Sequence, residues 1–253
     1  MQERAPVPPP PPAPRPLLPR SVLREEVLIV LSLSLLQSAV FAIIDLATAP
    51  VHGIAVSTFP TVPFATELAI VVFNLVPVWL VVHLLRRSGE GPASIGLQFD
   101  RPRFDVGAAA ALAAIVGAAG IGIYLAAVAL GVNRFVVPIP PEGHWWTVPI
   151  LVLGAAQNGL LEETIVVGYL LTRLRQLGLS WIPALSLSAL LRGSYHLYQG
   201  WGGFFGNALL GVFFGLVYIR WRRLWPIVIA HFLVDLGAGV GYLLFKQHLP
   251  GFH

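Results

Sequence analysis

Besides Arg192, five ionisable side chains lie deep inside strongly apolar stretches of this sequence, where charge is costly. They are Glu162, Glu163, His196, His231 and Asp235. A charged residue at the centre of a membrane helix costs roughly 2.5–3.5 kcal/mol on insertion scales, so such residues face a cavity or a partner and usually mark function. Carboxylates and imidazoles in one site can activate water, because Glu can act as a general base while imidazole orients the water, binds a metal or stabilises an oxyanion.

The composition indicates that these residues belong to an integral membrane protein. Of the 253 residues, 56% are hydrophobic and 11% are charged, whereas a soluble domain carries about 25% charged residues. The basic residues lie in small groups between apolar runs rather than in one patch, which is typical of membrane anchors and argues against nucleic-acid binding. Cysteine is absent, which excludes disulfide bonds and thiolate chemistry.

The apolar runs predict the fold class, because several of them are long enough to cross roughly 30 Å of hydrocarbon. We expect an all-α, polytopic transmembrane helix bundle of about seven spans, or eight if one helix is interrupted. The spans are expected at 27–47, 68–85, 106–130, 148–174, 181–198, 203–219 and 224–245. Three regions follow, namely a disordered, proline-rich cytoplasmic tail at 1–24, N-terminal transmembrane helices at 25–147, and a core at 148–246 that holds the polar residues.

The distribution of basic residues predicts the orientation of the chain. With a cytoplasmic amino terminus, the expected spans place 13 of the 16 basic residues inside and only Arg134 and Lys246 outside, while Arg192 lies within a span. Because cytoplasmic loops carry an excess of Lys and Arg, we expect a multi-pass protein of the cell membrane with its amino terminus in the cytoplasm and its carboxyl terminus outside. All basic residues except Lys246 are Arg, a bias that suggests a GC-rich, bacterial genome.

Helix geometry brings three of the polar groups to one depth. Glu162 and Glu163 lie 16 and 15 residues before Gly178, where the chain is expected to turn. His196 lies 17 residues after Leu179, on the returning helix. At about 1.5 Å per residue, the two carboxylates and the imidazole therefore reach nearly the same level in the membrane.

A third helix carries the other two groups. His231 and Asp235 are i, i+4 neighbours, so they project from one face. His231 is seven residues beyond Leu224 and Glu162 is 11 residues before Arg173, which corresponds to depths of about 10 and 16 Å. We therefore expect one site in the cytoplasmic half of the membrane. The alternative is a buried polar network that only holds the helices together.

The polar residues form three short motifs. They read Glu162-Glu163-x-x-x-Val167, Arg192-x-x-x-His196 and His231-x-x-x-Asp235. In this order, over roughly 148–244, they resemble the CPBP family of type II CAAX prenyl proteases and bacteriocin-processing enzymes, also called Abi proteins, whose pattern is EExxxR, FxxxH and HxxxD or HxxxN. The resemblance implies intramembrane endoproteolysis, in which Glu162 and His196 position the attacking water while His231 and Asp235 stabilise the oxyanion or complete a metal site.

The residue types do not decide whether the site uses a metal cofactor. A Zn²⁺ ion held by Glu162, His196 and His231 and a metal-free water activated by glutamate are both consistent with the donor types. Helical spacing puts Glu162 and Glu163 about 100° apart, so only one of them can point straight at the water. We expect Glu162 to be the base and Glu163 to be its orienting neighbour.

Two positions depart from the family pattern, since Val167 replaces the arginine of the first motif and Arg192 replaces the phenylalanine of the second. We interpret this as relocation of a cation from one helix to the next. Arg192 is i, i+4 to His196, so it lies one turn from the site on the same face. Our hypothesis is that Arg192 pairs with Glu163, keeps it ionised and leaves Glu162 for catalysis. The two departures are also compatible with a family member that has no catalytic activity.

Further expectations concern the residues next to the motifs and the binding partners of the protein. Asn158 is i, i+4 to Glu162 and is expected to hydrogen-bond either Glu162 or another helix, whereas Tyr195 is expected to pack. The expected partners are the lipid bilayer and a membrane-embedded or lipid-anchored peptide or protein substrate. Two other functions stay open: a non-catalytic scaffold or immunity protein, and a small proton-coupled transporter, which inverted repeats would favour.

Overall fold

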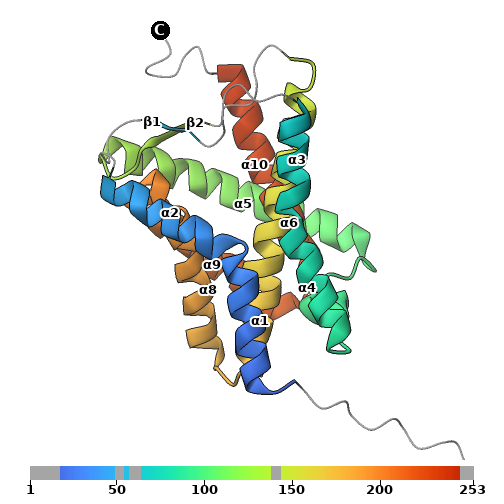
Figure 1. Ribbon diagram of the computed structural model, residues 1–253. Coiled ribbons are helices and arrows are strands. Elements are labelled where there is room, and N and C mark those ends of the chain that lie inside the picture. The colour runs from blue at the N-terminus through green and yellow to red at the C-terminus, as the bar shows by residue number, and fades with distance from the viewer. Residues whose placement is uncertain (1–17, 49–53, 57–63, 138–143, 246–253) are drawn as a thin grey trace, which may run out of the picture.

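The chain folds as a bundle of helices in the computed structural model, which describes residues 18–48, 54–56, 64–137 and 144–245 (Figure 1). The α-helices are α1 Arg20–Ser32, α2 Leu35–Thr48, α3 Phe64–Asn74, α4 Val76–Arg87, α5 Pro102–Ala129, α6 Thr147–Glu162, α7 Leu171–Gln176, α8 Trp181–Tyr195, α9 Trp201–Trp221 and α10 Trp225–Phe245. Between them lie the 3-10 turns η1 Pro92–Ile95 and η3 Leu197–Gln199, the π-helical segment η2 Glu163–Leu170, and the short strands β1 Ile54–Val56 and β2 Phe135–Val137, which pair in parallel. The expectation of an all-α polytopic bundle is confirmed.

The number of full-length spans in the described residues is smaller than expected. Five helical stretches are long and apolar enough to cross a membrane, at Phe64–Arg87, Pro102–Ala129, Thr147–Gln176, Trp201–Trp221 and Trp225–Phe245. The first expected span is instead two helices, α1 and α2, which meet at a bend of 52°. They form a sixth membrane crossing only if the two are taken as one span. The fifth, α8, has 15 residues and is about 22 Å long, which is less than the hydrocarbon thickness.

Local interactions explain both departures. At the bend between α1 and α2, the hydroxyl of Ser34 donates to the Val30 carbonyl at 2.6 Å, and a side chain that bonds the helix backbone in this way often bends it. Helix α8 ends at Tyr195 because the chain turns through η3 into Gly200, whose φ of +104° favours glycine. Near the amino terminus, α1 begins at Arg20, so the end of the expected tail at 1–24 is helical. Residues 1–17 of that tail lie outside the described part.

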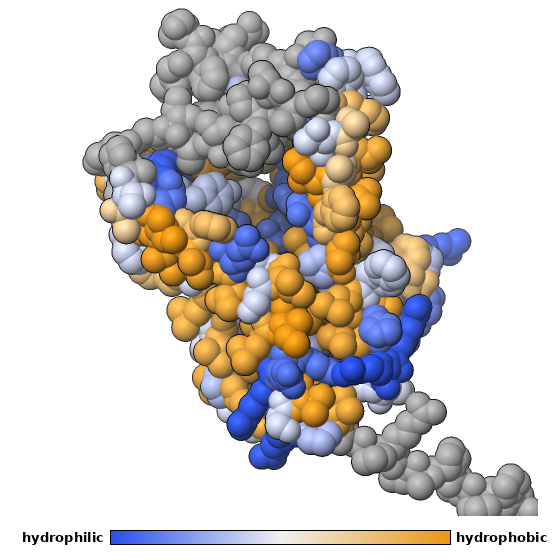
Figure 2. All heavy atoms as spheres, in the orientation of Figure 1, coloured by the Kyte–Doolittle hydropathy of each residue, from blue (hydrophilic) through white to orange (hydrophobic). Residues whose placement is uncertain are grey.

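The segment η2 forms the centre of the bundle. All eight of its residues are buried, and it contacts α1, α4, α8, α9 and α10. Large apolar side chains elsewhere point outward, including Phe73 and Trp79 with exposed fractions of 71% and 73%. Figure 2 shows hydrophobic side chains over the middle of the molecule and hydrophilic ones gathered near the start of α1 and the end of α4. This is the pattern of a protein whose outer surface faces lipid.

Buried ion pairs join the helix ends on the side where α1 begins. Arg173, of which 1% is exposed, donates to Glu90 at 2.5 Å and lies 3.9 Å from Glu26. Partial burial alone would raise the pKa of Glu90, but hydrogen bonds from Arg173 and Ser88 outweigh it and lower that pKa below its usual value. These contacts tie α1 and the α4–η1 turn to the end of α7.

A second arginine fastens the turn between α9 and α10. Arg223 donates to both carboxylate oxygens of buried Asp105 at 2.7 and 2.8 Å, which is the bidentate geometry that makes such pairs strong. A further hydrogen bond from Arg223 lowers the pKa of Asp100 below its usual value. The start of α10, the helix that carries His231 and Asp235, is thereby fixed against α5.

Candidate active site

Close packing of α6 against α10 brings the two glutamates to His231. A Cβ atom at Gly159 would lie 2.9 Å from the Val228 carbonyl oxygen, so only glycine allows this approach. One turn later α6 ends at Glu162 and the wider π-helical turns of η2 begin at Glu163. π-Helical turns are rare and frequently lie at functional sites. Here they keep Glu163 fully buried, whereas 14% of the Glu162 side chain is exposed.

Arg192 of α8 lies at the centre of the cluster. Its Nη1 donates to Glu163 Oε1 at 2.7 Å, and neither side chain is exposed. Its Nη2 lies 3.5 Å from Glu162 Oε2. Space for the guanidinium depends on α9, where a Cβ at Gly211 would come within 3.1 Å of Arg192 Cδ. The pairing of Arg192 with Glu163 that the sequence predicted is therefore present in the structure, across two helices.

His231 joins Glu163 to Asp235. Its Nδ1 lies 2.7 Å from Glu163 Oε1 and 3.3 Å from Arg192 Nη2. Because arginine only donates and an ionised carboxylate only accepts, Nδ1–H donates to Glu163 and the contact with Arg192 is a close approach of two donors. On the other side of the ring, Nε2 lies 3.5 Å from Asp235 Oδ2, and 31% of the Asp235 side chain is exposed. The cluster therefore becomes more open from Glu163 towards Asp235.

Tyr195 contacts Glu162 directly, which corrects the expectation that this residue only packs. Its hydroxyl donates to Glu162 Oε2 at 2.7 Å while the side chain is buried. The sequence held a usable signal, because a buried tyrosine hydroxyl needs a hydrogen-bond partner and Tyr195 adjoins His196. Glu162 thus receives a hydrogen bond from Tyr195 and lies 3.5 Å from the Arg192 guanidinium.

His196 is the first residue after α8 rather than part of the span. Its Nδ1 lies 2.9 Å from the Arg192 carbonyl oxygen. A carbonyl only accepts, so Nδ1 carries the proton and Nε2 of the neutral ring is left as the acceptor. No direct hydrogen bond between His196 and Glu162 is present in the described part of the chain. Asn158 takes the second of its two expected partners, since its Nδ2 lies 3.5 Å from Asp235 Oδ2 on α10.

The arrangement does not fit the zinc site considered above. Within the described residues, no three His, Asp or Glu side chains are placed to hold a metal ion. Both ring nitrogens of His231 face carboxylates, and a guanidinium lies within 3.5 Å of both His231 and Glu162. A fixed positive charge at that distance opposes binding of a second cation. The set Glu162, His196 and His231 is therefore not assembled as a metal centre.

What the cluster offers instead is a carboxylate beside an imidazole acceptor. Glu162 is partly exposed and oriented by Tyr195, and His196 has a free Nε2. Behind them, Arg192 holds buried Glu163, and Glu163 in turn accepts from His231. Preorganised donors and acceptors of this kind, in a site largely closed to solvent, can polarise a water molecule and stabilise developing charge.

The fold and the cluster together define a class of protein, a polytopic helical membrane protein with a buried acid–base site assembled from three of its helices. Residues 144–237 match the family described as type II CAAX prenyl endopeptidase, Rce1-like. The match confirms the resemblance to the CAAX protease family over this part of the chain, which holds all three motifs. No curated protein and no solved structure matches the chain.

Proposed function

We propose that this protein is an intramembrane endopeptidase that hydrolyses a peptide bond with water activated by Glu162. The observation that carries the proposal is the division between the two glutamates. Glu163 is buried and neutralised by Arg192, whereas Glu162 is partly exposed and receives the Tyr195 hydroxyl. The match to a family of endopeptidases supports the same reaction class. The proposed reaction needs no metal ion.

In the proposed step, Glu162 accepts a proton from a water molecule that also donates to Nε2 of His196. The resulting hydroxide adds to the carbonyl carbon of the substrate, and the C–N bond then breaks while the proton passes from Glu162 to the departing amine. In this step His231 is an imidazolium that donates Nδ1–H to Glu163, and the oxyanion forms near its Nε2–H, whose contact with Asp235 is long at 3.5 Å. Glu163 and Arg192 hold His231 and Glu162 in place and do not touch the substrate.

The proposed substrate is a membrane-embedded or lipid-anchored peptide or protein, because the cluster lies within helices that have apolar, outward-facing surfaces. Figure 2 shows a hollow between α2 and α3 with hydrophilic side chains inside it, which offers such a substrate a lateral approach. We also propose the orientation predicted from the basic residues, in which the protein lies in the cell membrane with its amino terminus in the cytoplasm and its carboxyl terminus outside. The start of α1 and the end of α10 lie at opposite ends of the molecule, which supports placing the two termini on opposite sides of the membrane (Figure 1).

The proposal is tested with purified protein in proteoliposomes and two internally quenched probes, a peptide ending in a prenylated CAAX box and a single-span peptide. We expect cleavage of at least one probe, and a loss of at least 100-fold in kcat/KM for Glu162→Gln and His196→Ala. Glu67→Gln and His83→Ala are matched controls on α3 and α4 and should cleave as the wild type does. Unchanged cleavage in both site variants would overturn the assignment, and a wild-type protein that binds the probes without cleaving them would point to a scaffold.

A further inference from the structure

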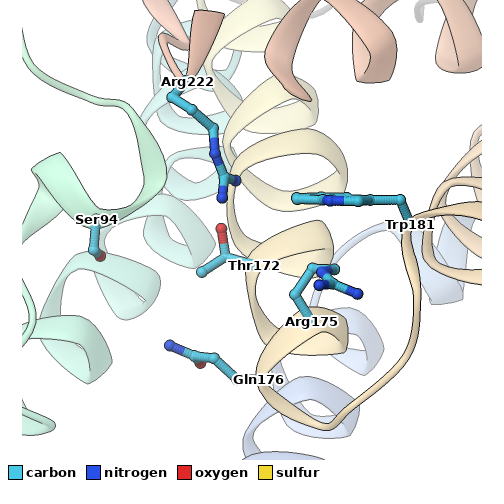
Figure 3. Close-up of a pocket in the computed structure, with 6 residues that line it drawn as sticks. All are labelled: Ser94, Thr172, Arg175, Gln176, Trp181 and Arg222. Atoms are coloured by element: carbon cyan, nitrogen blue, oxygen red, sulfur yellow. The ribbon is translucent and has the colours of Figure 1, made fainter. Parts of the chain in front are cut away.

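A second polar site lies where long apolar helices end, separate from the glutamate cluster. It is a pocket of about 400 Å³ lined by Ser94, Thr172, Arg175, Gln176, Trp181 and Arg222 (Figure 3). Three of these residues belong to α7, where the helix Thr147–Gln176 ends, and Arg222 directly follows Trp221 at the end of α9. Trp181 is the first residue of α8. The pocket therefore collects groups from the ends of three helices.

The pocket is strongly basic. Its lining holds two arginines and no carboxylate. In the described part of the chain no ion pair joins Arg175 or Arg222 to an acid. The nearest carboxylate with a contact to the lining is Glu90, which accepts from Gln176 at 2.6 Å and is already paired with Arg173. Two cations thus face a common space without a protein anion.

The two guanidinium groups lie against one aromatic ring, and Arg175 Nη1 also donates to the Leu179 carbonyl. The Cζ atoms of Arg175 and Arg222 lie 4.7 and 4.9 Å from the centroid of Trp181, within the range of cation–π attraction. Figure 3 shows the Arg222 side chain extending from the α9–α10 turn into the pocket, with its guanidinium directed towards Thr172. The ring thereby orders two flexible side chains before any ligand arrives.

The backbone at Arg222 supports a role for its side chain. Arg222 has a φ of +55° and is the one non-glycine residue with a positive φ in the described ranges. It caps α9, with its N–H donating to the Tyr218 carbonyl at 2.7 Å. Glycine is the residue that this cap position normally favours, because a side chain is strained there. An arginine at this position does not relieve the strain of the turn, so we attribute its presence to the contacts that its guanidinium makes.

We propose that this pocket binds a phosphate group, and that its usual source is the headgroup of an anionic phospholipid. Arginine presents N–H groups in a planar fork that matches phosphate oxygens. Tryptophan is enriched at the level of lipid headgroups, and the pocket lies where the helices leave the apolar region. Thr172 is nine residues after Glu163, or about 13 Å along the helix, so the ligand would not enter the acid–base site.

The test measures binding of dioleoyl-phosphatidylglycerol to the purified full-length protein by native mass spectrometry from detergent micelles. We expect the double variant Arg175→Gln/Arg222→Gly to bind at least tenfold more weakly than the wild type. Arg222→Gly keeps the turn, since glycine accepts the positive φ. The matched control is Arg220→Gln, which removes an exposed cation two residues away and should bind as the wild type does. Arg222→Lys should lose affinity because it keeps the charge without the fork.

The source of the phosphate is separated with two soluble probes, glycerol 1-phosphate and inorganic phosphate, which compete against the lipid. Competition by either probe, lost in the double variant, supports a phosphate site that also accepts free ligands. Binding of the lipid alone, likewise lost in the double variant, supports the headgroup as the source. Binding that stays within twofold of the wild type in the double variant overturns the proposal. So does an equal loss in Arg220→Gln, because attraction would then depend only on overall charge.

Discussion

Replacing Arg192 by alanine should destabilise the protein more than any other single truncation in the cluster. The change removes the partner of Glu163, and both side chains have an exposed fraction of 0% at a separation of 2.7 Å. Breaking a buried ion pair from one side costs about 3–5 kcal/mol, because a buried charge is left uncompensated. That loss corresponds to a fall of about 10²- to 10⁴-fold in the ratio of folded to unfolded protein.

A double-mutant cycle separates this effect from lost packing. The four proteins are the wild type, Arg192→Ala, Glu163→Gln and the variant with both changes, with the free energy of unfolding measured by denaturant titration in one detergent. We expect the double variant to be more stable than Arg192→Ala, because the neutral amide no longer needs a cation. A double variant no more stable than Arg192→Ala, or a loss below about 1 kcal/mol in the single variant, would refute the idea that Arg192 neutralises Glu163.

Three further predictions concern the relocated cation, the metal and acid stability. Adding Val167→Arg to Arg192→Ala should restore part of the lost activity in the probe assay, since residue 167 lies about one turn beyond Glu163; no recovery would count against relocation. Treating the wild type with a zinc chelator should leave cleavage unchanged, whereas inactivation that added Zn²⁺ reverses would favour a metal mechanism. Because the pKa of Glu90 is lowered in the folded state, its contribution to stability is present at neutral pH and is lost as the pH falls below about 4.5 through that pKa. Glu90→Gln should therefore lower the Tm at pH 7 and have a smaller effect at pH 3, and an equal effect at both would contradict the ion pair.

The sequence predicted the membrane class, the helical segments and the meeting of the polar groups, because these follow from apolar run length and helical spacing. Glu162, Glu163 and His196 lie at matching distances from one turn, so their helices bring them together wherever the bundle packs. The pairing of Arg192 with Glu163 was also predictable. Arg192 lies one helical turn from His196 on the same face, and a buried charge requires compensation.

Other features could not be read from spacing. The bend at Ser34 depends on one side-chain hydrogen bond inside an apolar run, and the end of α8 depends on the turn through η3 into Gly200. Tyr195 reaches Glu162 because of how α8 is rotated, which a run of apolar residues does not specify. Arg173 looked like an interfacial charge by its position, yet it is buried because the α4–η1 turn brings Glu90 against it. Contacts between loops and helix ends depend on tertiary packing that the local sequence does not determine.

The central claim is that Glu162 activates water and does not itself attack the substrate. A single turnover in H₂¹⁸O, followed by mass analysis of the new carboxyl group in the cleaved probe, tests this most directly. We expect one ¹⁸O atom to appear in that carboxyl group in the first turnover, and Glu162→Gln to yield no labelled product. Appearance of ¹⁶O from the enzyme in the first turnover, or labelled product at the wild-type rate from Glu162→Gln, would contradict it.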